Sequence, residues 1–159
     1  EYKALLPGAD TELLADNALL LEELIIKDHA AGTLEWTLTA PVSQVLVHGH
    51  CHQKALDAFS AVQQTLALIP DMDVSVIDSS CCGMAGAFGY GRDTTDVSMD
   101  MAELSLLPAV RKADADTLIV ADGTSCRHQI MDGTSRDAIH VVQILAMALR
   151  RAETLHGID

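Results

Sequence analysis

The chain has 159 residues, of which 49% are hydrophobic, and its 23 acidic residues outnumber 10 lysines and arginines to give a formal charge of -13. This length and apolar content suit one core, so we expect a single domain over residues 1–159. The negative charge argues against nucleic acid and anionic lipid as partners. No apolar run approaches the ~20 residues of a membrane span and no signal-like start is present, so we expect a cytoplasmic protein.

The first part of the chain has a helical pattern. From Thr11 to Ala30, leucine and isoleucine recur at helical spacing, which predicts one amphipathic helix. Leu34–Thr39 then alternates apolar and polar residues, which predicts a short edge strand or an arm that reaches a partner. Because the chain begins at Glu1 without methionine, we expect it to be a piece of a longer protein.

After Pro41, short apolar runs alternate with helical stretches. The runs predict strands at Val45–Val47, Val74–Ile77, Leu118–Ala121 and Ile139–Val142. The helical stretches predict helices at Gln53–Leu68, at Asp96–Val110, and from the fourth strand to about Arg151. Such alternation favours parallel strands with right-handed crossovers. We therefore expect an α/β fold, with a mainly parallel sheet of about four strands flanked by helices in a Rossmann-like, three-layer arrangement.

All four cysteines follow the ends of predicted strands. Cys51 follows the first strand, Cys81 and Cys82 follow the second, and Cys126 follows the third. The carboxyl ends of parallel strands share one edge of a sheet, so we expect the four thiols at one site. Cys51 and Cys126 also precede expected helices, whose N-termini favour the thiolate form. Thiolates are good ligands for zinc and for iron–sulfur centres, so the sequence predicts a metal or cluster site.

Other roles for these cysteines stay open from the residues alone. Free cysteines are frequently small buried hydrophobic residues. Cys81 and Cys82 are neighbours, and alpha carbons about 3.8 Å apart are too close for an unstrained disulfide. Two alternatives to a cluster are therefore a structural zinc domain and a thiol–disulfide catalyst or sensor.

Glycine, histidine and basic residues surround the cysteines. Gly83 opens a glycine-rich stretch whose amides can approach a sulfide or thiolate closely, although such a stretch can also be only a tight turn. Three histidines at alternate positions are candidate ligands or orienting groups, with His50 or His52 favoured: His48, His50 and His52. Three basic side chains either offset the charge of a cluster or are simply solvated: Lys54, Arg92 and Arg127.

Three segments together resemble the CCG, or cysteine-rich, domain: residues 48–54 (HGHCHQK), 78–86 (DSSCCGMAG) and 121–127 (ADGTSCR). That domain occurs in a subunit of heterodisulfide reductase and in the iron–sulfur subunits of glycolate oxidase and anaerobic glycerol-3-phosphate dehydrogenase. The chain is most similar to the C-terminal part of bacterial proteins that fuse an FAD-linked D-lactate or 2-hydroxy-acid dehydrogenase to an iron–sulfur module. The likeness spans Tyr2 to Arg150.

The resemblance implies an iron–sulfur (4Fe-4S type) electron-transfer domain of an FAD-linked 2-hydroxy-acid dehydrogenase of the D-lactate or glycolate type, inactive in isolation and without catalytic residues of its own. It places the cluster on Cys51, Cys81, Cys82 and Cys126, with Gly83 beside them. The motif frequently ends in Cys-x-x-Cys, whereas Gly123 stands at the first of those positions. Ligands from elsewhere in the protein, a zinc ion or an empty site are therefore further alternatives.

The resemblance also implies the surroundings of this chain. The chain corresponds to the second of two CCG halves, and FAD binds in an N-terminal domain outside it. The implied partners are the flavin and ferredoxin-like domains of the same polypeptide and an electron acceptor. The implied location is the cytoplasm, including the periphery of the inner membrane.

Overall fold

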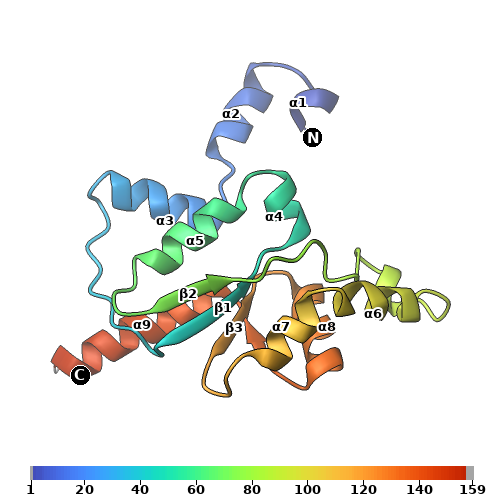
Figure 1. Ribbon diagram of the computed structural model, residues 1–159. Coiled ribbons are helices and arrows are strands. Elements are labelled where there is room, and N and C mark those ends of the chain that lie inside the picture. The colour runs from blue at the N-terminus through green and yellow to red at the C-terminus, as the bar shows by residue number, and fades with distance from the viewer. Residues whose placement is uncertain (1, 157–159) are drawn as a thin grey trace. The chain divides into compact units, whose positions relative to one another are not determined.

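The computed structural model describes residues 2–156, with side chains to Arg150 (Figure 1). The chain packs into two compact units, Glu1–Glu35 and Trp36–Asp159. The second unit contains the sheet and all four cysteines.

The first unit is helical, and it contains α1 (Tyr2–Leu5), α2 (Ala9–Asn17) and α3 (Leu21–Ala30). The prediction of one helix from Thr11 to Ala30 was wrong, because the chain leaves the helical path between Asn17 and Leu21. The Asn17 side chain donates to the Leu13 carbonyl at 2.8 Å near the end of α2. A Glu23 carboxylate oxygen accepts from the Leu20 N–H at 2.7 Å at the start of α3. These side-chain bonds satisfy backbone groups that a continuous helix would use.

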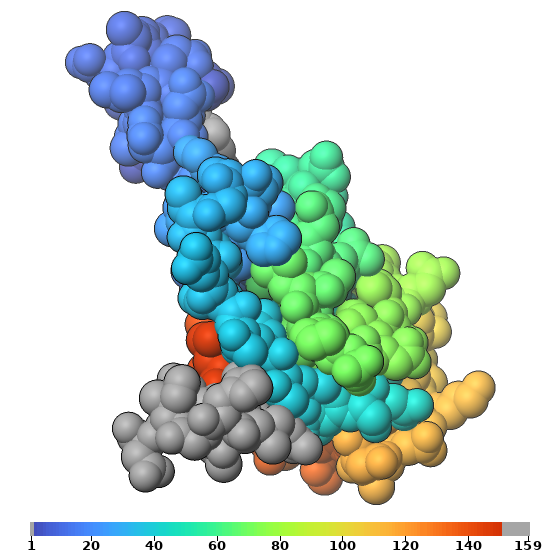
Figure 2. All heavy atoms as spheres, turned by 90° about the vertical axis from the view of Figure 1, so that its left-hand side faces the viewer, coloured from blue at the N-terminus to red at the C-terminus, as the bar shows by residue number. Residues whose placement is uncertain are grey.

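Residues 34–39 form no strand, so the predicted edge strand at Leu34–Thr39 was wrong. The Thr39 N–H donates to the carbonyl of Ala148 in α9 (Val141–His156) at 3.2 Å instead of to a sheet partner. From residue 36 onward this segment runs partly exposed along the surface of the second unit (Figure 2). Leu38 and Thr39 are partly buried there, whereas Trp36 is exposed, so burial does not follow the alternating pattern and the segment is not a paired strand.

The second unit contains a four-stranded parallel sheet, which confirms the predicted α/β fold. The strand order is β2-β1-β3-β4, and the strands are β1 (Gln44–His48), β2 (Asp73–Val76), β3 (Leu118–Ala121) and β4 (Ala138–Ile139). In the register of the sheet, Val47 lies opposite both Val76 and Val120. The fourth strand is shorter than the predicted Ile139–Val142 because α9 begins at Val141.

Two predicted helices are each divided in two. Gln53–Leu68 is α4 (Cys51–Ala55) and α5 (Phe59–Ala67), separated where Asp57 takes a left-handed φ of 57°. Asp96–Val110 is α6 (Thr95–Glu103) and α7 (Leu106–Lys112). Pro108 has no N–H to donate to a preceding turn, and it lies in the first turn of α7, where N–H groups need no helical partner.

Helices cover both faces of the sheet (Figure 1). The layer of α6, α7 and α8 (Thr124–Thr134) buries an apolar cluster that includes Leu106, Ile119 and Ile130, each at most 1% exposed. The chain moves outward from β1 to β2, then crosses back over β1 to β3. This reversal places the topological switch point, where open α/β sheets bind ligands, between the carboxyl ends of β1 and β3. Among the described residues, no helix is long and apolar enough to cross a membrane.

Candidate metal centre

The four cysteines lie just beyond the carboxyl ends of three strands. Cys51 is the first residue of α4 after β1, and Cys126 is in the first turn of α8 after β3. Cys81 and Cys82 lie in the loop after β2. Cys51 and Cys126 were expected to precede their helices, and they instead lie inside the first turns.

Two of the thiols form a buried pair with a histidine. The Sγ atoms of Cys82 and Cys126 are 3.3 Å apart, and their side chains are almost fully buried. His48, the last residue of β1, is 1% exposed. Its ring and the two sulfurs offer three donor atoms that all lie within 4.8 Å of one another. We call His48, Cys82 and Cys126 the inner group.

The other two thiols are half-buried and form the outer pair, Cys51 and Cys81. The Gly83 N–H donates to Cys81 Sγ at 3.3 Å. Burial raises the pKa of Cys51, and the nearby Cys81 thiol raises this pKa further. Cys82 also contributes to this rise, so the outer pair lies within electrostatic reach of the inner group. The fold therefore brings all four cysteines to one end of the sheet.

The two inner cysteines share a hydrogen bond, which shifts their pKa values in opposite directions. The hydrogen bond from Cys126 is the main reason that the pKa of Cys82 is lowered to about 4, and His48 and the Met84 N–H act in the same direction. The same sulfur pair and burial raise the pKa of Cys126. The hydrogen bond therefore favours the thiolate form of Cys82 and the thiol form of Cys126. A thiolate is the form that binds metal.

The loop that carries Cys82 is fixed by close packing at Gly83. Gly83 has a φ of 91°, and a Cβ atom there would lie 2.1 Å from the Ser98 carbonyl oxygen in α6. Ser98 is itself held by Gln129 of α8, whose side-chain amide donates to the Ser98 carbonyl and hydroxyl oxygens at 3.0 Å each. Because all three residues are buried, only glycine fits here with α6 and α8 in place.

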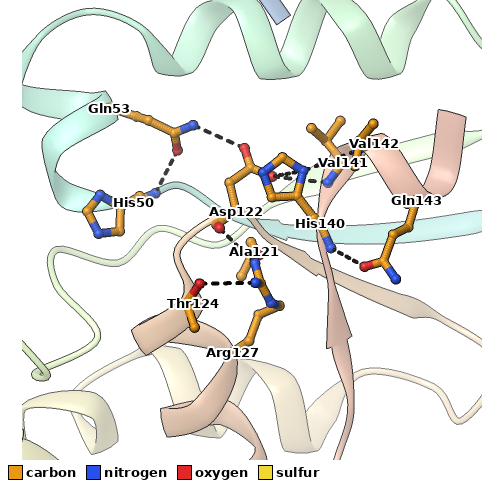
Figure 3. Close-up of polar contacts among 10 residues, drawn as sticks. All are labelled: His50, Gln53, Ala121, Asp122, Thr124, Arg127, His140, Val141, Val142 and Gln143. Carbon is orange, nitrogen blue, oxygen red and sulfur yellow. Dashed lines mark hydrogen bonds and ion pairs between the residues drawn. The ribbon is translucent and has the colours of Figure 1, made fainter. Parts of the chain in front are cut away.

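Asp122, at the end of β3, links the starts of α4 and α9 (Figure 3). One carboxylate oxygen accepts from the Gln53 side-chain amide of α4 at 3.0 Å, and the other accepts from the Val141 N–H of α9 at 3.0 Å. Gln53 in turn accepts from the His50 N–H at 3.3 Å. This network holds the starts of α4 and α9 against the end of β3.

Two of the basic residues near the cysteines hold loop carbonyl groups. Arg127 donates to the carbonyl oxygens of Ala121 and Asp122 at 2.9 and 2.7 Å. Lys54 donates to the Ser79 carbonyl, beside the cysteine loop. Arg92 is exposed to solvent.

His50 caps the helix that begins with Cys51. Its Nδ1 atom accepts from the His52 N–H at 3.3 Å, which together with the Gln53 bond makes a reciprocal capping box. A second His-x-x-Gln box, His140 and Gln143, caps α9. Sequence reasoning missed both boxes, although the repeated spacing before a helical run was the available signal. His52 is exposed, so of the three bracketing histidines only His48 belongs to the inner group.

Gly123 lies against His50 at the start of α8. A Cβ atom at Gly123 would lie 2.4 Å from His50 Cδ2 and 2.9 Å from Cys126 Sγ. A side chain at position 123 therefore does not fit while the His50 ring keeps its place.

The chain is similar in sequence to one subunit of a bacterial enzyme. Over 106 residues the chain is 31% identical to the subunit designated C of the anaerobic glycerol-3-phosphate dehydrogenase of Escherichia coli strain K12, and to that of strain O157:H7. The matched region is 67% of this chain and 26% of each relative, so the chain spans about a quarter of the length of these relatives. No family model matches the chain, and no solved structure matches it.

Proposed function

We propose that this chain is an iron–sulfur electron-transfer domain of a larger FAD-linked dehydrogenase. The ligands of its 4Fe-4S type cluster are Cys51, Cys81, Cys82 and Cys126. The substrate of the whole enzyme is a 2-hydroxy acid of the D-lactate or glycolate type, a class that rests on the sequence resemblance alone. FAD and ferredoxin-type clusters belong to domains outside this chain, which are its partners together with an electron acceptor. The expected location of the whole enzyme is the cytoplasm, with the periphery of the inner membrane as the alternative.

The gathering of four cysteines at the switch point of the sheet carries this proposal. Four thiols from three separate loops meet where open α/β sheets bind their ligands. The sequence similarity to one component of a dehydrogenase supports a redox role for this gathering.

The donor set fits a group that contains several metal atoms. Two sulfurs on one tetrahedral ion lie about 3.8 Å apart, from a metal–sulfur distance of about 2.3 Å. The inner sulfurs lie 3.3 Å apart, so they would separate slightly to bind one ion. The three donor atoms that lie within 4.8 Å of one another do not include either thiol of the outer pair. A cluster spans a wider site than one ion does, so inner and outer cysteines can bind different iron atoms.

The chain's own residues shape the site for electron transfer. An iron–sulfur cluster held by these cysteines would accept and release single electrons. Burial of the inner group excludes water from one side of the site, while the half-buried outer pair leaves the other side open toward a partner. Backbone N–H groups reach the sulfurs from Gly83 and Met84, and such donors stabilise thiolate charge.

Anaerobic purification of the full-length protein, with iron and acid-labile sulfide assays, tests this proposal. Cys82→Ser and Cys126→Ser should each lose the iron and sulfide of one cluster. Ser80→Ala, a change at an exposed neighbour of the cysteine pair, should lose none. Equal iron and sulfide in all four proteins would contradict the proposal.

A structural zinc ion is the second candidate, because the inner group alone supplies three donors at the spacing of one ion. Metal analysis that finds zinc and no iron in anaerobically prepared protein would favour it. The low pKa of Cys82 also suits thiol–disulfide exchange, but burial of Cys82 and Cys126 closes this pair to a second protein. Mass spectrometry under oxidising conditions would detect a disulfide between them if that chemistry occurred.

A further inference from the structure

We propose that His48 is a ligand of the same metal centre, through its Nε2 atom, beside Cys82 and Cys126. This inference rests on the proposed function, since it requires metal at these sulfurs. It adds one imidazole to the four thiolates of the expected donor set, so one iron atom would have two protein ligands.

The unpaired nitrogen of His48 is the first reason. Nε2 is buried and has no hydrogen-bond partner among the described residues, in a side chain that is 1% exposed. Buried polar atoms nearly always have a partner, so an orphaned one indicates a missing ion or ligand. The three donor atoms of the inner group lie within 4.8 Å of one another.

The other ring nitrogen sets the correct tautomer. The Ser79 hydroxyl donates to the Ile77 carbonyl at 3.5 Å, so its lone pair is available to the Nδ1 proton of His48 at 2.8 Å. With a metal bound, the proton is on Nδ1 and Nε2 offers its lone pair to the metal, in place of the hydrogen bond through which the ring lowers the pKa of Cys82 in the metal-free protein. Histidines that bind metals typically donate their second N–H to such an outer acceptor.

The position of His48 is fixed by the sheet. His48 is the last residue of β1 and lies opposite Ala121 in the register with β3, the strand that leads to Cys126. A nitrogen and a sulfur on one tetrahedral ion lie about 3.5 Å apart, from bond lengths of about 2.1 and 2.3 Å. The donor atoms of the inner group lie within 4.8 Å of one another, so small side-chain movements would bring them to this spacing.

The neighbouring histidines are less suited to this role. His50 Nδ1 accepts the His52 N–H, so in the neutral ring its proton is on Nε2 and no lone pair is free there. His52 is exposed. Gly123 has no side chain to offer as a metal ligand, and a larger residue at this position would collide with His50.

Nitrogen hyperfine spectroscopy on the full-length protein tests the assignment. The protein is labelled with ¹⁵N-histidine, reconstituted with iron and sulfide, reduced, and examined by pulsed electron paramagnetic resonance. The wild type should show coupling to a bound histidine nitrogen. His48→Ala should lose this coupling and at least tenfold in iron affinity. The matched variants His50→Ala and His52→Ala should keep it.

A second variant keeps the test valid if His48→Ala fails to fold. His48→Cys replaces the imidazole by a thiolate, so it should retain iron, lose the nitrogen coupling, and have a lower reduction potential than the wild type. A loaded wild-type cluster without histidine coupling would overturn the role of His48 and leave the proposed function intact. Failure of these cysteines to bind any metal would overturn both.

Discussion

Replacement of Gly83 by alanine tests the packing that holds the cysteine loop. At a φ of 91°, an L side chain is strained by about 1–2 kcal/mol. The new Cβ would also lie 2.1 Å from the Ser98 carbonyl oxygen, a backbone atom that cannot rotate away. Overpacking of this kind costs about 1–3 kcal/mol more. We therefore expect Gly83→Ala to lower the free energy of unfolding by about 2–5 kcal/mol.

Gly86 supplies the matched control in the same loop. Its φ is 70°, and a Cβ atom there would meet nothing within 4 Å. Gly86→Ala should therefore lose only the backbone contribution, about 1–2 kcal/mol. Urea unfolding of both variants, followed by far-ultraviolet circular dichroism, measures the difference. If the two variants lose equal stability, the contact with Ser98 does not constrain the loop and the argument for Gly83 is wrong.

Three further predictions concern the site. In reduced, metal-free protein, the pKa of Cys82 is lower in the folded chain than in the unfolded one, so the unfolded chain binds more protons above about pH 4. The free energy of unfolding should therefore rise from about pH 4 toward the ordinary thiol pKa, and this gain should be lost as the pH falls back through about 4. Thermal unfolding of Cys82→Ser should lack this part of the rise, and an unchanged slope would contradict the lowered pKa. Asp122→Ala should lower stability by about 1–3 kcal/mol because Gln53 and the start of α9 lose an acceptor; Asp132→Ala, at an exposed position, should change it little in the same urea experiment. Gly123→Ala should also lower the free energy of unfolding by about 1–3 kcal/mol. In a double-mutant cycle, His50→Ala should relieve this loss, because the new Cβ atom would contact the His50 ring. Additive losses would show that the ring is not the obstacle.

The sheet could be predicted because its strands are short apolar runs, and the two central strands, β1 and β3, are largely buried. The run at Leu118–Ala121 matches β3 residue for residue, and the runs at Val45–Val47 and Val74–Ile77 match β1 and β2 to within one residue at either end. Helix ends were less predictable, because local capping decides them. Glu23 and Asn17 divide the first helix through bonds to single backbone groups, which a periodic pattern of apolar residues does not contain.

The order of residues along the chain shows which of them follow each strand, and so which end of a parallel sheet the four cysteines reach. Their division into a buried inner pair and a half-buried outer pair depends on side-chain directions and on the packing of α6 and α8 around Gly83, so it could not be predicted from the order of residues. The same holds for the histidines. His48, His50 and His52 look equivalent along the chain, but the strand end directs His48 into the core, the helix start uses His50 as a cap, and His52 is left in solvent.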